Sequence, residues 1–99
     1  MGDDVQAMKN KMFRGRVLRT LDNYYPKAIE LREVKATLQS GGMTIISDIY
    51  RIIDYLIDKG YVKSLDGSEM LADDDLVKLT AKGVDLLENT ITDEGVNVL

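Results

Sequence analysis

An apolar stripe in the middle of the chain constrains the fold more than any other feature of the sequence. In the segment TIISDIYRIIDYLIDKG, residues 44–60, apolar side chains recur at i, i+4, i+7 and i+11, which is helical spacing. At 100° per residue the stripe falls within an arc of about 140° on one side of the helix. Its members are Ile45, Ile46, Ile49, Ile52, Ile53, Leu56 and Ile57. A face this broad must be buried, so the polar side of this helix is the side that faces solvent.

Weaker signals on both sides of this helix complete the predicted order of elements. Pro26 ends a long first helix, and the glycines at 41–42 end a second one. YVKSL and LVKLT alternate as β-strands do. The last helix is expected to bury Val84 and Leu87, with Leu86 or Ile91 nearby. The predicted elements are helices over 4–23, 31–40, 44–60 and 80–89, an extended segment over 27–30, and strands over 61–65 and 76–80.

Length and element order together predict the fold class. The 99 residues suit one domain, and a chain that is 44 % hydrophobic and 30 % charged can form one compact core. Two adjacent helices joined by a Gly-containing turn suit a helix-turn-helix unit, and a hairpin directly after them makes it winged. The predicted fold is mainly α: a winged helix-turn-helix with a three-helix core, a two-stranded β-hairpin wing and a C-terminal helix. It occupies residues 1–99 as a single domain, with its core over about 13–90.

Two stretches of the chain resemble a known family. SDIYRIIDYLIDKGYVKSL resembles the recognition helix and first wing strand of winged-helix regulators of the MarR, PadR and ArsR kind, and LVKLTAKGVDLLEN resembles their second wing strand and following helix. The chain is also similar to small phage- and prophage-encoded winged-helix proteins. The resemblance implies double-stranded DNA as the partner and transcription regulation as the function. It does not carry over ArsR-type metal sensing, because the chain has neither Cys nor His.

The loop between the two predicted strands is strongly acidic. DGSEMLADDD, residues 66–75, contains five carboxylates and no Lys or Arg. Residues 1–36 carry eight basic and five acidic groups, whereas residues 37–99 carry five basic and twelve acidic groups. Because carboxylates repel a polyanion, we expect this loop to be solvated and not to hold DNA phosphate. Either the third helix and basic residues elsewhere hold DNA, or the partner is not DNA.

The third helix and the base of the wing supply the expected DNA contacts. In winged-helix domains the exposed N-terminal half of the third helix lies in the major groove. Arg51 is suited to bind guanine there, and Asp48 to accept a hydrogen bond from cytosine. The other expected contacts are Thr44 and Ser47 on this helix, Lys63 and Lys78 on the strands, and Arg32 and Lys35 on the second helix.

A second basic stretch lies in the first helix. Lys9, Lys11, Arg14, Arg16 and Arg19 have no acidic residue among them. Such a stretch either supplies a phosphate-binding surface or forms a solvated helix face. The residues alone do not decide between these two interpretations.

Catalysis is not expected from this chain. Without His and Cys the usual general base and the reactive thiol are absent, and the serines have no adjacent base. The glycines form no phosphate-binding loop, and the carboxylates lack the spacing of an EF-hand. The sequence therefore predicts neither a cofactor nor a metal.

A protein–protein interaction module that keeps the fold without binding DNA is the alternative function. Its contact candidates are Met70, Leu71, Tyr50 and Tyr55, and the other interpretation of Met70 and Leu71 is that they fold back on the body. Met8 and Met12, together with the C-terminal tail, are the elements expected to form a homodimer. No signal-peptide block and no run of membrane-spanning length occurs, so a cytoplasmic protein with no membrane contact is expected.

Overall fold

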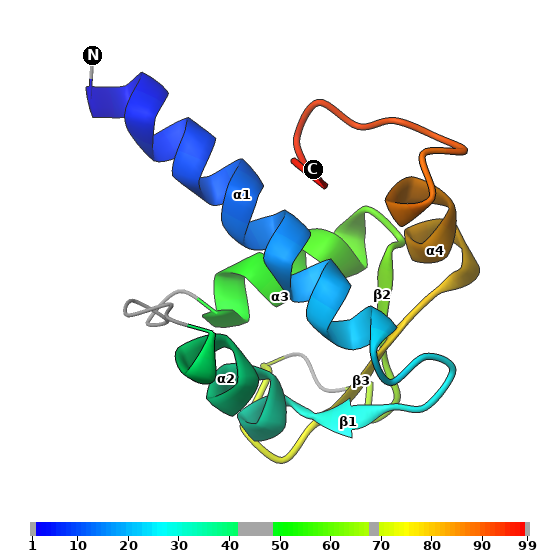
Figure 1. The fold of residues 1–99 in the computed structure, drawn as a ribbon. Coiled ribbons are helices and arrows are strands. Elements are labelled where there is room, and N and C mark those ends of the chain that lie inside the picture. Colours follow the sequence, from blue (N-terminus) through cyan, green and yellow to red (C-terminus); the bar gives the residue numbers. More distant parts are fainter. Residues whose placement is uncertain (1, 42–48, 68–69, 99) are drawn as a thin grey trace.

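The computed structural model describes residues 2–41, 49–67 and 70–98, which form four helices and one small sheet (Figure 1). The helices are α1 (Gly2–Asp22), α2 (Leu31–Ser40), α3 (Ile49–Asp58) and α4 (Ala81–Leu87). The strands are β1 (Ile29–Glu30), β2 (Val62–Ser64) and β3 (Leu76–Leu79). The described part of the chain is therefore mainly helical, as the sequence predicts.

The sheet has three antiparallel strands, whereas the sequence predicts a hairpin of two. β3 is the central strand, with β1 on one side and β2 on the other. The extended segment before α2 is the additional strand, in which Ile29 lies opposite Val77 and Glu30 opposite Leu76. The two-stranded prediction is wrong because a strand of two residues is too short to show a recognisable alternation. This pairing ties the start of α2 to β3.

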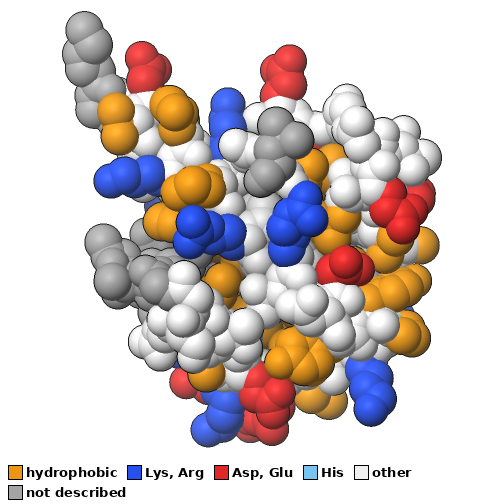
Figure 2. Space-filling view, in the orientation of Figure 1, with side chains coloured by type: hydrophobic (Ala, Val, Ile, Leu, Met, Phe, Trp, Pro, Cys, Tyr) orange, Lys and Arg blue, Asp and Glu red, His pale blue; other side chains and the backbone are white. Residues whose placement is uncertain are grey.

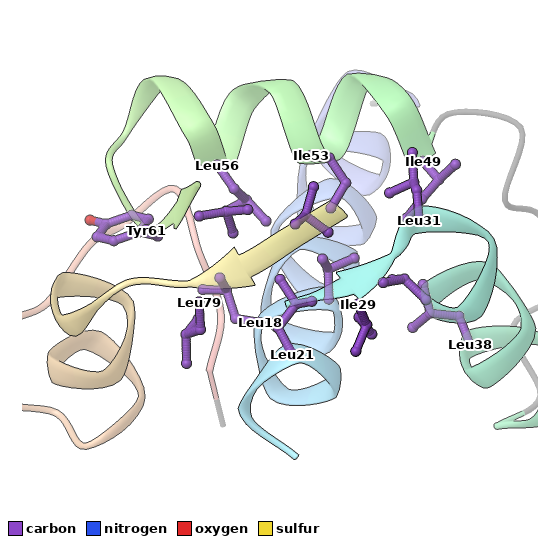
Figure 3. Close-up of a cluster of buried hydrophobic side chains, with 14 of the residues drawn as sticks. Leu18, Leu21, Ile29, Leu31, Leu38, Ile49, Ile53, Leu56, Tyr61 and Leu79 are labelled. Atoms are coloured by element: carbon purple, nitrogen blue, oxygen red, sulfur yellow. The ribbon is translucent and has the colours of Figure 1, made fainter. Parts of the chain in front are cut away.

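Side chains from all four helices and all three strands form one buried core. The apolar stripe of the middle helix supplies Ile49, Ile53 and Leu56, which are fully buried, while Ile52 and Ile57 are half-buried at its edges. Figure 3 shows the buried three pointing from α3 toward side chains of α1, α2 and the sheet. Truncating one such side chain to alanine costs about 2–5 kcal/mol of stability. Burial of this face fixes which side of α3 reaches solvent.

Thr80 joins the start of α4 to the end of the α3 segment. Its hydroxyl oxygen accepts a hydrogen bond from the Gly83 amide at 3.1 Å, which is an N-cap interaction. The same hydroxyl donates to the Gly60 carbonyl at 2.6 Å. Gly60 has a φ of +85°, the left-handed conformation that favours glycine after a helix. The helix stop that the sequence predicts at Gly60 is confirmed.

α4 differs from its prediction in length and in the residues that it buries. The sequence predicts Val84 and Leu87 as the inward residues, with Leu86 or Ile91 nearby. Gly83 and Leu86 are the buried residues of the helix, and Val84, Leu87 and Ile91 are half-buried. A Cβ on Gly83 would lie 2.5 Å from the Tyr61 carbonyl oxygen, so α4 packs there against the chain before β2. The prediction is wrong because a helix of seven residues spans too few turns for its periodicity to define one face.

The first turns of α1 extend beyond the body of the protein (Figure 1). Val17, Leu18 and Leu21 in the second half of the helix are buried in the core. In the first half, Met8 is 69 % exposed and Met12 38 % exposed. The homodimer expected through this helix stays a prediction.

Candidate nucleic-acid interface

Lys63 and Lys78 lie directly opposite each other on neighbouring strands, in the register that pairs β2 with β3. The next pair along the strands, Val62 and Leu79, is buried in the core on the other face of the sheet. The two lysines therefore share the outer face, and neither forms an ion pair with a described residue. Like charges directly opposite each other destabilise a sheet, and a bound anion relieves that repulsion. Two residues predicted to hold phosphate are thus brought together.

Arg51 is the basic residue on the described part of α3, and its side chain is exposed. Within the described residues it forms no ion pair. Asp54 and Asp58 on the same helix are also exposed, so the solvent face of α3 is not basic overall. The other expected contacts on this helix, Thr44, Ser47 and Asp48, lie outside the described residues.

Arg32 and Lys35 on α2, also expected to hold phosphate, already contact carboxylates of the protein. Arg32 Nε lies 3.1 Å from a carboxylate oxygen of Glu30 in an exposed pair, which contributes little. Lys35 Nζ lies 2.9 Å from Asp73 Oδ1 and donates to the Tyr50 hydroxyl at 3.1 Å. The hydrogen bond to Asp73, and after it the one to Tyr50, raises the pKa of Lys35 above its ordinary value. A phosphate at Lys35 would compete with Asp73.

The acidic loop folds back onto the start of α2. The first amides of a helix have no partner within the helix, and the N-cap residue Glu30 supplies none with its side chain. The Leu31 amide donates instead to the Asp75 carbonyl at 2.9 Å, and the Arg32 amide to the Asp73 carbonyl at 2.9 Å. Main-chain oxygens of the loop therefore cap α2 in place of a capping side chain.

Asp73 connects this loop to two helices. Its carboxylate accepts hydrogen bonds from the Tyr50 hydroxyl of α3 and the Lys35 ammonium of α2. These two contacts, that of Tyr50 first, hold the pKa of Asp73 below its ordinary value. The acid is thus engaged by a cation of the protein and is not a free repelling charge.

Two further carboxylates of the loop accept hydrogen bonds from its own main chain. Asp75 Oδ2 accepts from the Ala72 amide at 2.7 Å, and Asp75 is buried. Asp66 Oδ2 accepts from the Leu76 amide at 2.8 Å and so closes the loop at the start of β3. The expectation of a solvated loop is wrong for Asp75. Short acidic side chains satisfy nearby amides at turns, and a run of aspartates does not reveal which of them will do so.

Met70 and Leu71 behave differently from each other. Leu71 is half-buried and packs against the core, whereas Met70 is 86 % exposed. Leu65, at the other end of the same loop, is 48 % exposed. The described parts of the loop therefore present apolar as well as acidic side chains to solvent.

Sequence reasoning missed a polar cluster around Asp93. The side chain of Asp93 is 10 % exposed and pairs with Lys59 Nζ at 3.2 Å. It also accepts from the Tyr61 hydroxyl at 2.6 Å and from the Gly95 amide at 2.7 Å. Burial raises the pKa of Asp93, but the contacts with Tyr61, Gly95 and Lys59 outweigh burial and leave this pKa below its ordinary value. Burial and the Asp93 carboxylate raise the pKa of Tyr61 to about 12.

This cluster anchors the C-terminal strap, residues 90–98, which follows α4 without helix or strand and returns to α1 (Figure 1). The sequence contained one signal for the strap, which was the isolated Gly15 in the middle of α1. A glycine inside a helical pattern marks a close approach of another segment.

Comparisons with protein-family models, with curated proteins and with solved structures found no match to this chain. No helix in the described part of the chain is long and apolar enough to cross a membrane. An assignment of function therefore depends on the residues themselves, above all on the opposed lysines of the sheet.

Proposed function

We propose that this protein is a winged helix-turn-helix domain that binds double-stranded DNA as a small regulator of transcription. The opposed pair Lys63 and Lys78 carries the proposal. In a protein with a net charge of −4 these two lysines lack a carboxylate partner among the described residues. Their mutual repulsion is relieved when a phosphate lies between them.

The placement of α3 supports the same function. α3 buries one face in the core and keeps Arg51 in solvent, as a helix that enters a groove must do. A recognition helix places residues of its N-terminal half against base edges, where an arginine binds guanine through O6 and N7. β2 follows α3 after a short connection, so the sheet lysines suit the role of phosphate contacts beside the helix.

The acidic loop opposes DNA binding less than its sequence suggests. Asp73 is paired with Lys35, and Asp75 is buried. Asp74 is the exposed member of that aspartate run. A paired acid repels phosphate less than a free one, so the loop imposes a smaller penalty than five free carboxylates.

A protein partner is the second candidate, and Met70 favours it. A methionine that is 86 % exposed, with Leu65 48 % exposed in the same loop, is a feature of adaptable contact surfaces. Under this alternative the fold is kept and the loop, not α3, makes the contact.

An NMR titration with a mixed-sequence DNA duplex at low and moderate salt separates the two functions. DNA binding predicts shifts at the amides of Arg51, Lys63 and Lys78 that diminish as salt rises. The amide of Glu88, after α4, serves as an internal control and should not move. Absence of binding even at low salt would exclude the DNA function and favour a protein partner.

A further inference from the structure

The C-terminal strap crosses α1 at a glycine. The Asn97 amide donates to the Lys11 carbonyl of α1 at 3.0 Å. A Cβ on Gly15 would overlap the carbonyl oxygen of Asn97, so the two segments approach this closely only where α1 has no side chain. Glycine is otherwise a poor residue for a helix interior. Its presence at position 15 therefore serves the crossing.

Two arginines of α1 donate to main-chain oxygens of this strap. Arg14 Nη1 donates to the Gly95 carbonyl at 3.0 Å, and Arg19 donates to the Val98 carbonyl. Both acceptors are neutral, so these hydrogen bonds bring no negative charge to either arginine. The Arg14 guanidinium also lies over the Tyr55 ring, 3.7 Å from its centroid, which is a cation–π contact.

The neighbouring residues of α1 bring no negative charge to these two arginines either. Residues 5–21 contain five basic and no acidic residues, and none of the five forms an ion pair within the described residues. Figure 2 shows Lys and Arg side chains gathered along α1. On a protein of net charge −4, α1 is thus a local positive surface.

A hollow of about 170 Å³ lies where the strap meets this surface. Its lining residues are Met12, Gly15, Arg16, Arg19 and Asn97. Arg16 and Arg19 stand at i and i+3, so they are neighbours on one side of the helix. Two guanidinium groups beside a hollow suit a phosphate group, which arginine binds through two parallel hydrogen bonds.

Beyond its anchor at Asp93 the strap is held by the buried Val96 and by hydrogen bonds to α1, and only its end, residues 97–98, lies over the hollow beside Arg16 and Arg19. Val96 is the one side chain of its described residues that is buried. A second hollow of about 560 Å³ is lined by residues of the strap together with Lys11, Leu86 and Asn89. A hydrogen bond from a guanidinium to phosphate is roughly twice as strong as a neutral one. A phosphate can therefore compete with the Val98 carbonyl for Arg19.

We propose that α1 carries a second phosphate-binding surface, centred on Arg16 and Arg19, and that the end of the C-terminal strap is a displaceable cover on it. The ligand is the phosphate backbone of nucleic acid. That this nucleic acid is DNA rests on the proposed function. That the surface binds phosphate does not depend on it. Binding lifts residues 97–98 from α1, while Asp93 and the buried Val96 keep the rest of the strap attached.

Gly15→Ala tests the cover directly, because the added Cβ excludes the strap from its crossing while alanine favours the helix. Gly41→Ala is the matched control, since a Cβ there meets its nearest atom at an ordinary 3.5 Å. Fluorescence anisotropy measures the affinity of each variant for a mixed-sequence duplex at several salt concentrations. For Gly15→Ala we expect at least about threefold tighter binding at low salt and a slope of log K against log salt that is steeper by about one, because Arg19 is freed from the Val98 carbonyl. Gly41→Ala should match the wild type.

Adding Arg16→Ala and Arg19→Ala to Gly15→Ala should abolish the gain, and both side chains are exposed, so the fold tolerates their loss. The proposal is overturned if Gly15→Ala displaces the NMR signals of the strap but keeps the affinity and salt slope of the wild type.

A titration of the wild-type protein with inorganic pyrophosphate provides a test that needs neither DNA nor a variant. We expect saturable shifts at the side-chain Nε–H groups of Arg16 and Arg19 and at the Asn97 amide. If these shifts occur and the protein binds no duplex, the phosphate-binding surface is supported and the proposed DNA-binding function is contradicted. If the duplex shifts Lys63 and Lys78, while neither the duplex nor pyrophosphate shifts α1 or the strap, the DNA-binding function is supported and this proposal is overturned.

Discussion

The side chains of Lys35 and Asp73, 38 positions apart in the sequence, meet at 2.9 Å and join α2 to the loop before β3. Tyr50 of α3 donates to the same carboxylate, so one acid contacts both α2 and α3. The main-chain carbonyl of Asp73 also accepts from the Arg32 amide at 2.9 Å. A loop whose composition indicates a solvated, protruding segment therefore holds α2 in place.

Replacing Asp73 by Asn is expected to lower the pKa of Lys35 toward its ordinary value, because the hydrogen bond to this carboxylate is the main cause of the raised pKa. The pKa of Asp73 is itself lowered, so its contacts stabilise the fold at pH above about 3.9 and lose this effect as pH falls through the folded pKa. NMR titration of the Lys35 side chain measures the change. Asp74→Asn is the control, since Asp74 is exposed. An equal drop in the pKa of Lys35 in both variants would contradict the assignment of Asp73 as its cause.

Thr80→Ala is expected to lower the free energy of unfolding by about 1–2 kcal/mol, because the variant loses the N-cap of α4. The hydroxyl also donates to the Gly60 carbonyl, which is left without that donor. Urea denaturation measures the loss. Thr80→Ser keeps the hydroxyl and should retain most of the stability, whereas equal losses in the two variants would show that the methyl group matters and the cap does not.

Asp93→Asn is expected to cost about 1–3 kcal/mol at neutral pH, because the Tyr61 and Lys59 donors lose an ionised, largely buried acceptor. The folded pKa of Asp93 lies below its unfolded value, so the stabilisation is present above about pH 4 and disappears as pH falls through the folded pKa. Urea denaturation at neutral and at acid pH should show the difference from wild type shrinking on acidification. A difference that does not change with pH would contradict the ionised state, and Glu94→Gln, an exposed change in the same strap, should differ little from wild type at either pH.

Local periodicity predicted the parts of the fold that depend on neighbours in sequence. The helical spacing of Ile49, Ile53 and Leu56 identified the buried face of α3, and Gly60 identified its end. Pairings between distant segments left no such pattern. β1 is recognisable only through its partner β3, and the role of Asp75 depends on how the loop turns.

The candidate interface was predictable to a similar extent. The sequence predicted one lysine on each strand, Lys63 and Lys78, as phosphate contacts, but only the register of β2 with β3 shows that they lie directly opposite each other. The engagement of Lys35 by Asp73 was not predictable, because it joins two segments through tertiary packing. The cover over the arginines of α1 was also missed, although Gly15 was a visible signal for a close approach.

The salt dependence of duplex binding by the Lys63→Ala, Lys78→Ala double variant tests the central claim most directly. If the opposed lysines hold phosphate, the slope of log K against log salt should become shallower by about two relative to wild type, because two phosphate contacts are lost. The variant should be no less stable than wild type, since the repulsion between the lysines is removed with them. Lys82→Ala, which removes an exposed charge from the start of α4, should keep the wild-type slope. A double variant that binds the duplex with unchanged affinity and unchanged slope would contradict the proposed interface.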